Sequence, residues 1–141
     1  MTKTKYGKYI LKDTGGKKLS PAAAGVMPVT LEGLKDWGGI QHRMKWTFIS
    51  QPTAVFNAPH SHDFDEIFVF LSIDPANPTD FAAEIELSLG EEQEKQVITS
   101  PSVVCLPKGL VHGPLNFKAV TKPVLFCQIY LSPEYVEKPV A

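Results

Sequence analysis

Proline and glycine interrupt this chain at short intervals, and that punctuation restricts its possible folds more than any other feature. The 141 residues include 12 prolines and 10 glycines. Between the breaks, apolar and polar residues alternate, most clearly over residues 41–49 and 81–89. A period of two is typical of half-buried strands, and proline within a sheet is confined to edges, strand starts and bulges. About eight short strands at roughly 8–12-residue spacing predict an all-β sandwich or closed barrel rather than an α/β fold.

Composition and charge exclude several classes of function. Hydrophobic residues make up 43% of the chain and charged residues 21%, with a net charge of −1. This is the balance of a globular domain, and it supplies no overall field that would attract nucleic acid or a membrane surface. No apolar run approaches the ~20 residues of a membrane helix, and the lysine-rich start lacks a following apolar signal segment. We therefore expect a cytoplasmic protein with neither nucleic acid nor membrane as a partner.

The two cysteines lie in apolar, strand-like runs. Cys105 occurs in VVCLP and Cys127 in VLFCQIY. We expect both to be buried, reduced thiols that act as small hydrophobic residues, because disulfides are rare in cytosolic proteins. A disulfide between them is the alternative if neighbouring strands bring them together.

The stretch 59-PHSHDFDEIFVF-70 breaks the alternation rule for a strand. His60, His62 and Glu66 recur at even spacing, on the strand face that also carries three phenylalanines. Polar groups on a core face cost about 2–7 kcal/mol each unless something satisfies them. A metal ion would satisfy all three, because two imidazoles and a carboxylate on one face can converge on one ion.

A second cluster lies forty residues further on, in 107-PKGLVHGPLN-116. Pro107 and Gly109 predict a tight turn that is followed by His112. Together the two stretches resemble the signature motifs of the cupin superfamily, with H-x-H-x3-E in the first and P-x-G-x2-H-x3-N in the second. The resemblance covers about residues 57–131. It implies a single jelly-roll β-barrel, here with an N-terminal extension, which holds one metal through His60, His62, Glu66 and His112.

The implied site predicts a cofactor but leaves the reaction open. Three imidazoles and one carboxylate accept Fe(II), Mn(II), Ni(II), Co(II) or Zn(II), and we expect one such divalent ion per chain. By family analogy, we favour an enzyme that acts as an oxygenase, isomerase or lyase on a small organic substrate. The alternative is a non-catalytic protein that binds or senses a metal chelate or a small metabolite.

Alternation in residues 41–49 places His42, Met44, Trp46 and Phe48 on one face, which we interpret as the barrel interior. His42 is then a candidate acid–base residue, although a hydrogen-bonded core histidine fits the same pattern. Arg43 falls on the opposite, outward face, and an inward role for it would require a bulge in the strand. The full set of candidate substrate-pocket residues is Trp46, Phe48, Phe68, Phe126, Gln128 and Tyr130.

We divide the chain into three parts. Residues 1–40 are expected to form an N-terminal arm and an edge strand, residues 41–132 the barrel, and residues 133–141 a C-terminal tail. Exposed strand edges and faces are ready to pair with a second copy, so we also expect a homodimer.

Overall fold

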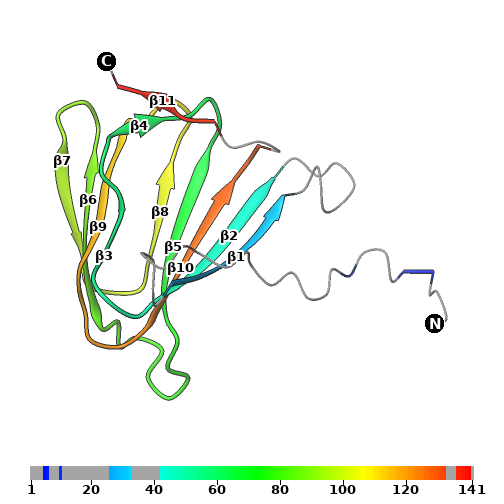
Figure 1. The fold of residues 1–141 in the computed structure, drawn as a ribbon, viewed down its shortest axis with the longest axis vertical. Helices are drawn as coiled ribbons and strands as arrows, with labels where there is room; N and C mark the ends of the chain where they lie inside the picture. Colours follow the sequence, from blue (N-terminus) through cyan, green and yellow to red (C-terminus); the bar gives the residue numbers. More distant parts are fainter. Residues whose placement is uncertain (1–4, 7–9, 11–25, 33–41, 133–135, 141) are drawn as a thin grey trace.

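The fold consists of two antiparallel β-sheets that face each other (Figure 1). It was obtained as a computed structural model, which describes residues 5–6, 10, 26–32, 42–132 and 136–140. The first sheet contains, in spatial order, β1 (Val26–Glu32), β2 (Arg43–Ile49), β10 (Val124–Tyr130), β5 (Glu66–Ser72) and β8 (Ser102–Leu106). The second contains β11 (Lys138–Pro139), β4 (His60–Ser61), β9 (His112–Val120), β6 (Ala83–Leu89) and β7 (Glu94–Ile98), with β3 (Thr53–Phe56) also paired to β9. The predicted all-β fold is confirmed.

The core lies between the two sheets and is rich in phenylalanine. Phe70 and Phe126, from neighbouring strands of the first sheet, stack with ring centroids 4.9 Å apart. Phe117 of the second sheet meets Phe126 across the core, at 5.7 Å. All three side chains are fully buried, and burial of each stabilises the fold by about 1.5–3 kcal/mol. Phe68 connects this core to the cluster of histidines described below, because its ring is 5.2 Å from Phe126 and 5.9 Å from His112.

The prediction of which residues of strand β2 face the interior is wrong. Thr47 and Ile49 are buried, whereas Phe48 between them is 40% exposed. The register agrees, because Thr47 lies opposite the buried Phe126 of β10, and directly opposed residues share a face of the sheet. Trp46 and Phe48 therefore lie on the outer face, while Arg43 and Lys45 lie on the inner face, with no bulge in the strand.

The even spacing of the first motif predicted one continuous strand, and this prediction is wrong. His60 lies in β4 of the second sheet, and Glu66 is the first residue of β5 in the first sheet. The intervening residues form the connection between the sheets. His60 and Glu66 lie in the same buried cluster because the chain passes from the second sheet to the first between them.

The cysteine prediction holds for one residue of the two. Cys127 is buried and Cys105 is exposed, and both are free thiols. Cys105 is opposite Ile67 on β5, and this row of the first sheet faces outward. The expectation that Cys105 is buried is therefore wrong.

The predicted domain boundaries remain predictions. Most of the proposed N-terminal arm falls outside the described residues, apart from β1, which forms an edge of the first sheet. Within the expected C-terminal tail, residues 138–139 form β11 and pair with β4 (Figure 1). Among the residues that the structure describes, there is no helix with the length and hydropathy needed to cross a lipid bilayer.

Candidate metal centre

Strand pairing brings His60 and His112 together. They are direct partners in the β4–β9 ladder, and opposed residues of an antiparallel pair project to the same face. Their ring centroids are 4.5 Å apart. Both side chains are almost completely buried, with 4% and 1% of their surface exposed.

The connection from β4 to β5 adds His62 and Glu66 to this pair. The turn of the second motif holds this connection in place through two hydrogen bonds that its backbone N–H groups donate. Gly109 N–H donates to the carbonyl oxygen of His62 at 2.9 Å, and Lys108 N–H donates to Asp65 Oδ1 at 2.8 Å. The two sequence motifs therefore position each other as well as supplying the polar side chains.

A glycine directly after His112 allows two segments of the site to approach closely. Gly113 has a φ of +104°, and an added Cβ there would lie 2.6 Å from the ring of Phe56. The same atom would lie 3.1 Å from the carbonyl oxygen of Ala58, in the segment that leads to His60. A side chain at this position would be strained and would also collide with its neighbours.

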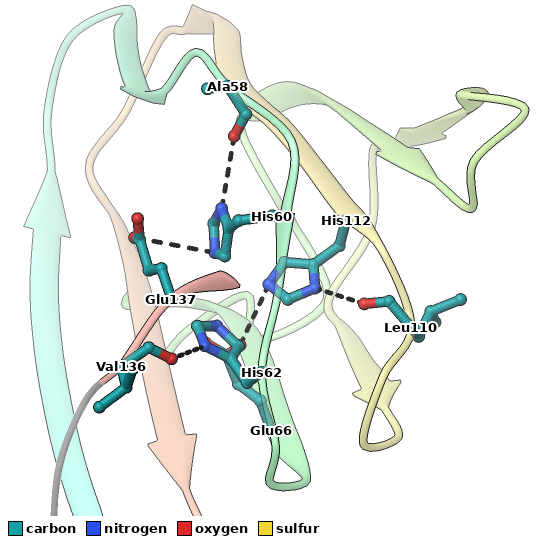
Figure 2. Close-up of polar contacts among 8 residues, drawn as sticks. All are labelled: Ala58, His60, His62, Glu66, Leu110, His112, Val136 and Glu137. Carbon is teal, nitrogen blue, oxygen red and sulfur yellow. Dashed lines mark hydrogen bonds and ion pairs between the residues drawn. The ribbon is translucent and has the colours of Figure 1, made fainter. Parts of the chain in front are cut away.

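Each histidine of the cluster has one ring nitrogen against a backbone carbonyl oxygen (Figure 2). The three contacts are His60 Nδ1 to Ala58 at 3.3 Å, His62 Nδ1 to Val136 at 2.7 Å and His112 Nδ1 to Leu110 at 3.0 Å. A carbonyl oxygen can only accept, so Nδ1 must carry the proton in each ring. Each Nε2 then has its lone pair available for a metal ion, which is the usual outer-shell arrangement of histidine ligands.

The three imidazoles lie close to one another, and Glu66 lies beside two of them. The three histidines offer ligand atoms that all lie within 4.8 Å of one another. Glu66 Oε2 is 3.1 Å from His62 Nε2 and 3.2 Å from His112 Nε2. Two ligand atoms bound at about 2.1 Å to one ion, at right angles, would be about 3 Å apart. Glu66 Oε2 and His112 Nε2 are buried, and neither completes a hydrogen bond of good geometry, so this donor set fits a divalent metal ion.

The electrostatics of the cluster favour a charged Glu66 beside imidazoles. Burial by itself raises the pKa of Glu66, but the contacts with His112 and His62 outweigh it, and the net shift of its pKa is downward. Burial also lowers the pKa of His60, and the neighbouring His112 lowers it further. Metal binding needs an ionised carboxylate and neutral imidazoles. Burial lowers the pKa of His62 as well, but the contacts with Glu66 and the Val136 carbonyl outweigh it, and the net shift of its pKa is upward. The shifts at Glu66 and His60 favour the protonation states that a metal ion requires, whereas at His62 the ion has to displace a more tightly held proton.

Aromatic rings surround the cluster. Phe64 stacks on His62 at a centroid distance of 4.6 Å, and Phe56 meets His60 edge-on at 4.8 Å. Phe68 meets His112 at 5.9 Å. These rings fix the imidazole planes and give the donor atoms an apolar environment, in which charge interactions are stronger than in water.

The C-terminal segment also contributes to the site, a contribution that neither sequence motif indicates. Besides the Val136 carbonyl on His62, Glu137 Oε1 lies 3.9 Å from His60 Nε2 (Figure 2). Lys138 on β11 forms an ion pair with Asp63 at 2.7 Å. The contact with His62 joins residues 74 positions apart and uses a main-chain atom, so no side-chain motif could have indicated it.

Four of the six candidate pocket residues face the interior. Phe68, Phe126, Gln128 and Tyr130 are all buried, and the Tyr130 ring is 6.3 Å from His62. The other two, Trp46 and Phe48, lie on the outer face of the first sheet, so their assignment to the pocket is wrong. The assignment had assumed that the apolar face of β2 is the inner one.

His42 is not part of the histidine cluster. It precedes β2 directly, and the next residue, Arg43, faces inward. His42 was a catalytic candidate because it was expected to lie on the inner face of this strand, and that expectation is wrong. The inner positions of this strand are instead occupied by Arg43 and Lys45, which the sequence analysis had placed on the outer face.

No protein-family model and no curated protein sequence matches the chain. Solved structures do. An oxalate oxidase is 16% identical over 89% of this chain, with a TM-score of 0.56. The polyketide cyclase RemF from Streptomyces resistomycificus is 15% identical over 86% of this chain, which covers 75% of the RemF chain, with a TM-score of 0.55. Bacillus subtilis oxalate decarboxylase is 9% identical over 82%, with a TM-score of 0.54.

These neighbours are all cupin-fold proteins, and the chain has the cupin jelly-roll fold that its two motifs predicted. It spans 59% of the oxalate oxidase chain and 28% of the oxalate decarboxylase chain. At these levels of identity the likeness establishes the fold, and the chemistry has to be argued from the site.

Proposed function

We propose that this chain is a metal-dependent enzyme that acts on a small organic molecule at a mononuclear centre. His60, His62, Glu66 and His112 would hold one divalent transition metal ion. The observation that carries the proposal is the convergence of buried donors, with Glu66 Oε2 3.1 and 3.2 Å from two imidazole nitrogens whose opposite nitrogens are bound to backbone carbonyls. Oxalate oxidase and oxalate decarboxylase, two structural neighbours, are named for reactions on a small molecule.

The protein side chains would have different roles at the metal centre. The histidines bind through Nε2 while Ala58, Val136 and Leu110 fix their ring orientation. Glu66 supplies negative charge, and Phe64 and Phe68 exclude water from the donor atoms. When bound, the ion would supply Lewis acidity and a coordination position for a substrate or for O2. This arrangement is compatible with an oxygenase, an isomerase or a lyase.

Metal analysis combined with oxygen uptake tests this proposal. The protein is purified without a chelator or an affinity tag, stripped, and reloaded anaerobically with Fe(II), Mn(II) or Zn(II). Oxygen consumption and substrate loss are then followed over diketones, catechols and hydroxy acids. About one metal ion per chain with turnover of one class supports an enzyme, and O2 consumption identifies an oxygenase.

Two other outcomes have separate meanings. A bound metal without turnover of any compound favours the alternative function, the binding or sensing of a chelate or small metabolite. If no metal is bound after reloading, the proposal is overturned for both functions.

A further inference from the structure

A buried glutamine of β10 lies on the inner face of the first sheet. Strand β10 is in the middle of that sheet, between β2 and β5 (Figure 1). Gln128 is 6% exposed, and the residues two positions before and after it, Phe126 and Tyr130, are also buried. Residues two apart on a strand share a face, and Phe68, directly opposite Gln128 on β5, is fully buried as well. The amide side chain therefore points toward the space between the two sheets.

The side-chain amide of Gln128 forms no hydrogen bond with any residue that the structure describes. An amide offers two N–H donors and a carbonyl oxygen, and its burial without partners costs free energy. The fully enclosed polar atoms that lack a partner in the described part of the chain belong to other residues, so the Gln128 amide keeps some accessible surface. A small molecule that enters between the sheets can therefore reach it.

The strand register places Gln128 close to the proposed metal ligands. Tyr130 lies two residues further along β10 and is directly opposite Glu66. One strand spacing and two residues therefore separate the Cα atoms of Gln128 and Glu66, a distance of about 8 Å. On the neighbouring strand, the ring of Phe68 lies 5.9 Å from the ring of His112. One small molecule can therefore contact the metal centre and this amide together.

We propose that Gln128 binds a hydroxyl group of the substrate, whose other end binds the metal ion. This inference rests on the proposed function and narrows its substrate class to small metal-chelating molecules that carry a further hydroxyl group. A hydroxyl group both donates and accepts hydrogen bonds, which matches the amide. A site that hydrogen-bonds a substrate hydroxyl rejects an analogue without it, because the buried protein group is then left unpaired.

Three hydroxy acids of equal charge test the inference. The acids α-hydroxyvalerate, α,γ-dihydroxyvalerate and α,δ-dihydroxyvalerate share one metal-chelating end and differ in the further hydroxyl group. Zinc-loaded wild-type protein is titrated calorimetrically with each of them. We expect one of the dihydroxy acids to bind at least about fivefold more tightly than α-hydroxyvalerate, the value of one neutral hydrogen bond. Any attraction of the shared carboxylate to Lys45, which lies opposite Gln128, cancels in this comparison.

Matched variants separate binding from structure. Gln128→Met removes the amide at similar side-chain length, so this variant should bind the three acids equally. Gln51→Met, at an exposed residue after β2, should keep the wild-type preference. Zinc affinity and the binding of α-hydroxyvalerate should be unchanged in both variants. Gln128→Met should also unfold at no lower urea concentration than the wild type, because it no longer buries an unpartnered amide, whereas a purely structural role would lower that concentration and leave the preference intact.

The negative results are distinguishable. A zinc-loaded wild type that binds the three acids equally, or binds none of them, overturns the inference and leaves the metal centre in place. A folded Gln128→Met variant that keeps the wild-type preference also overturns it. If the wild type binds no zinc, the proposed function itself fails, and the inference fails with it because the substrate then has no metal ion to bind.

Discussion

The two ring nitrogens of each clustered histidine have separate tasks, and His62 shows this most clearly. Its Nδ1 donates to the Val136 carbonyl at 2.7 Å while its Nε2 faces Glu66 at 3.1 Å. Replacing His62 removes the Nε2 ligand atom together with the hydrogen bond that orients its ring. Since the loss of an outer-shell partner alone typically lowers metal affinity by about 10–100-fold, the loss of the ligand itself should have at least that effect.

We therefore expect His62→Ala to lower zinc affinity by about 100-fold or more, measured by competition with a chromogenic chelator. His42→Ala is the matched control, because His42 is outside the cluster, and it should bind zinc like the wild type. Wild-type affinity in His62→Ala would show that His62 is not a ligand.

Gly113 provides a second test at the scale of the residue. Gly113→Ala should lower the free energy of unfolding by about 1–3 kcal/mol, because its φ is strained for alanine and its Cβ meets Phe56 and Ala58. Gly109→Ala also has a positive φ, but its added Cβ meets nothing within 4 Å, so its cost should be smaller. Urea unfolding of both variants measures the difference. An equal cost for the two variants would contradict the close approach at Gly113.

The proposed ligands were predictable from sequence because they are side chains at the characteristic spacing of the two motifs. Glu137 and the Val136 carbonyl were not predictable, since they reach the cluster only after β11 pairs with β4. A main-chain oxygen has no sequence signature at all. Motif analysis thus finds the donors that face the ion and misses the groups that orient them.

At the scale of the element, strand β2 shows why alternation alone misassigned the interior. Alternation gives two faces and does not say which is the inner one. The first sheet is apolar on its outer face as well, where Phe48, Leu71 and Val103 are exposed by 40%, 41% and 61%. The apolar set of β2 therefore pointed to the wrong side. Its polar inner set, Arg43 and Lys45, breaks the same rule that the histidines break in the first motif.

Although strand β11 is short, we expect it to have a large effect on zinc affinity. A chain that ends at Ser132 loses the Val136 carbonyl on His62 and the pairing of β11 with β4. We expect its zinc affinity to fall by about 10–100-fold, while circular dichroism continues to report a folded β protein.

The ion pair between Lys138 and Asp63 serves as the control for that truncation. Both side chains are exposed, so Lys138→Met should change stability by about 1 kcal/mol at most and leave zinc affinity unchanged. If the truncated chain binds zinc as tightly as the wild type, the C-terminal segment has no part in the metal centre.

At the scale of the whole molecule, the apolar outer face of the first sheet supports the expected homodimer. Phe48, Leu125 and Leu71 form one row across β2, β10 and β5, and Val103 on β8 lies opposite Val69 of the same face. Exposed apolar surface of this kind favours association. We expect light scattering to report a dimer for the wild type and a monomer for Leu71→Asp combined with Val103→Asp.

Val97→Asp, at an exposed valine of β7 in the second sheet, is the control and should remain dimeric. A wild type that is monomeric at all concentrations would rule out the dimer, and a Val97→Asp variant that alone dissociates would move the interface to the other sheet.

The proposed metal centre requires that His60, His62, Glu66 and His112 bind one metal ion together. The most direct measurement is a zinc titration of stripped wild-type protein, followed by X-ray absorption at the zinc edge. We predict about one zinc per chain, with imidazole nitrogen and carboxylate oxygen at about 2.0–2.2 Å and no sulfur at about 2.3 Å. Failure to bind zinc, or a sulfur ligand from Cys105 or Cys127, would contradict the account.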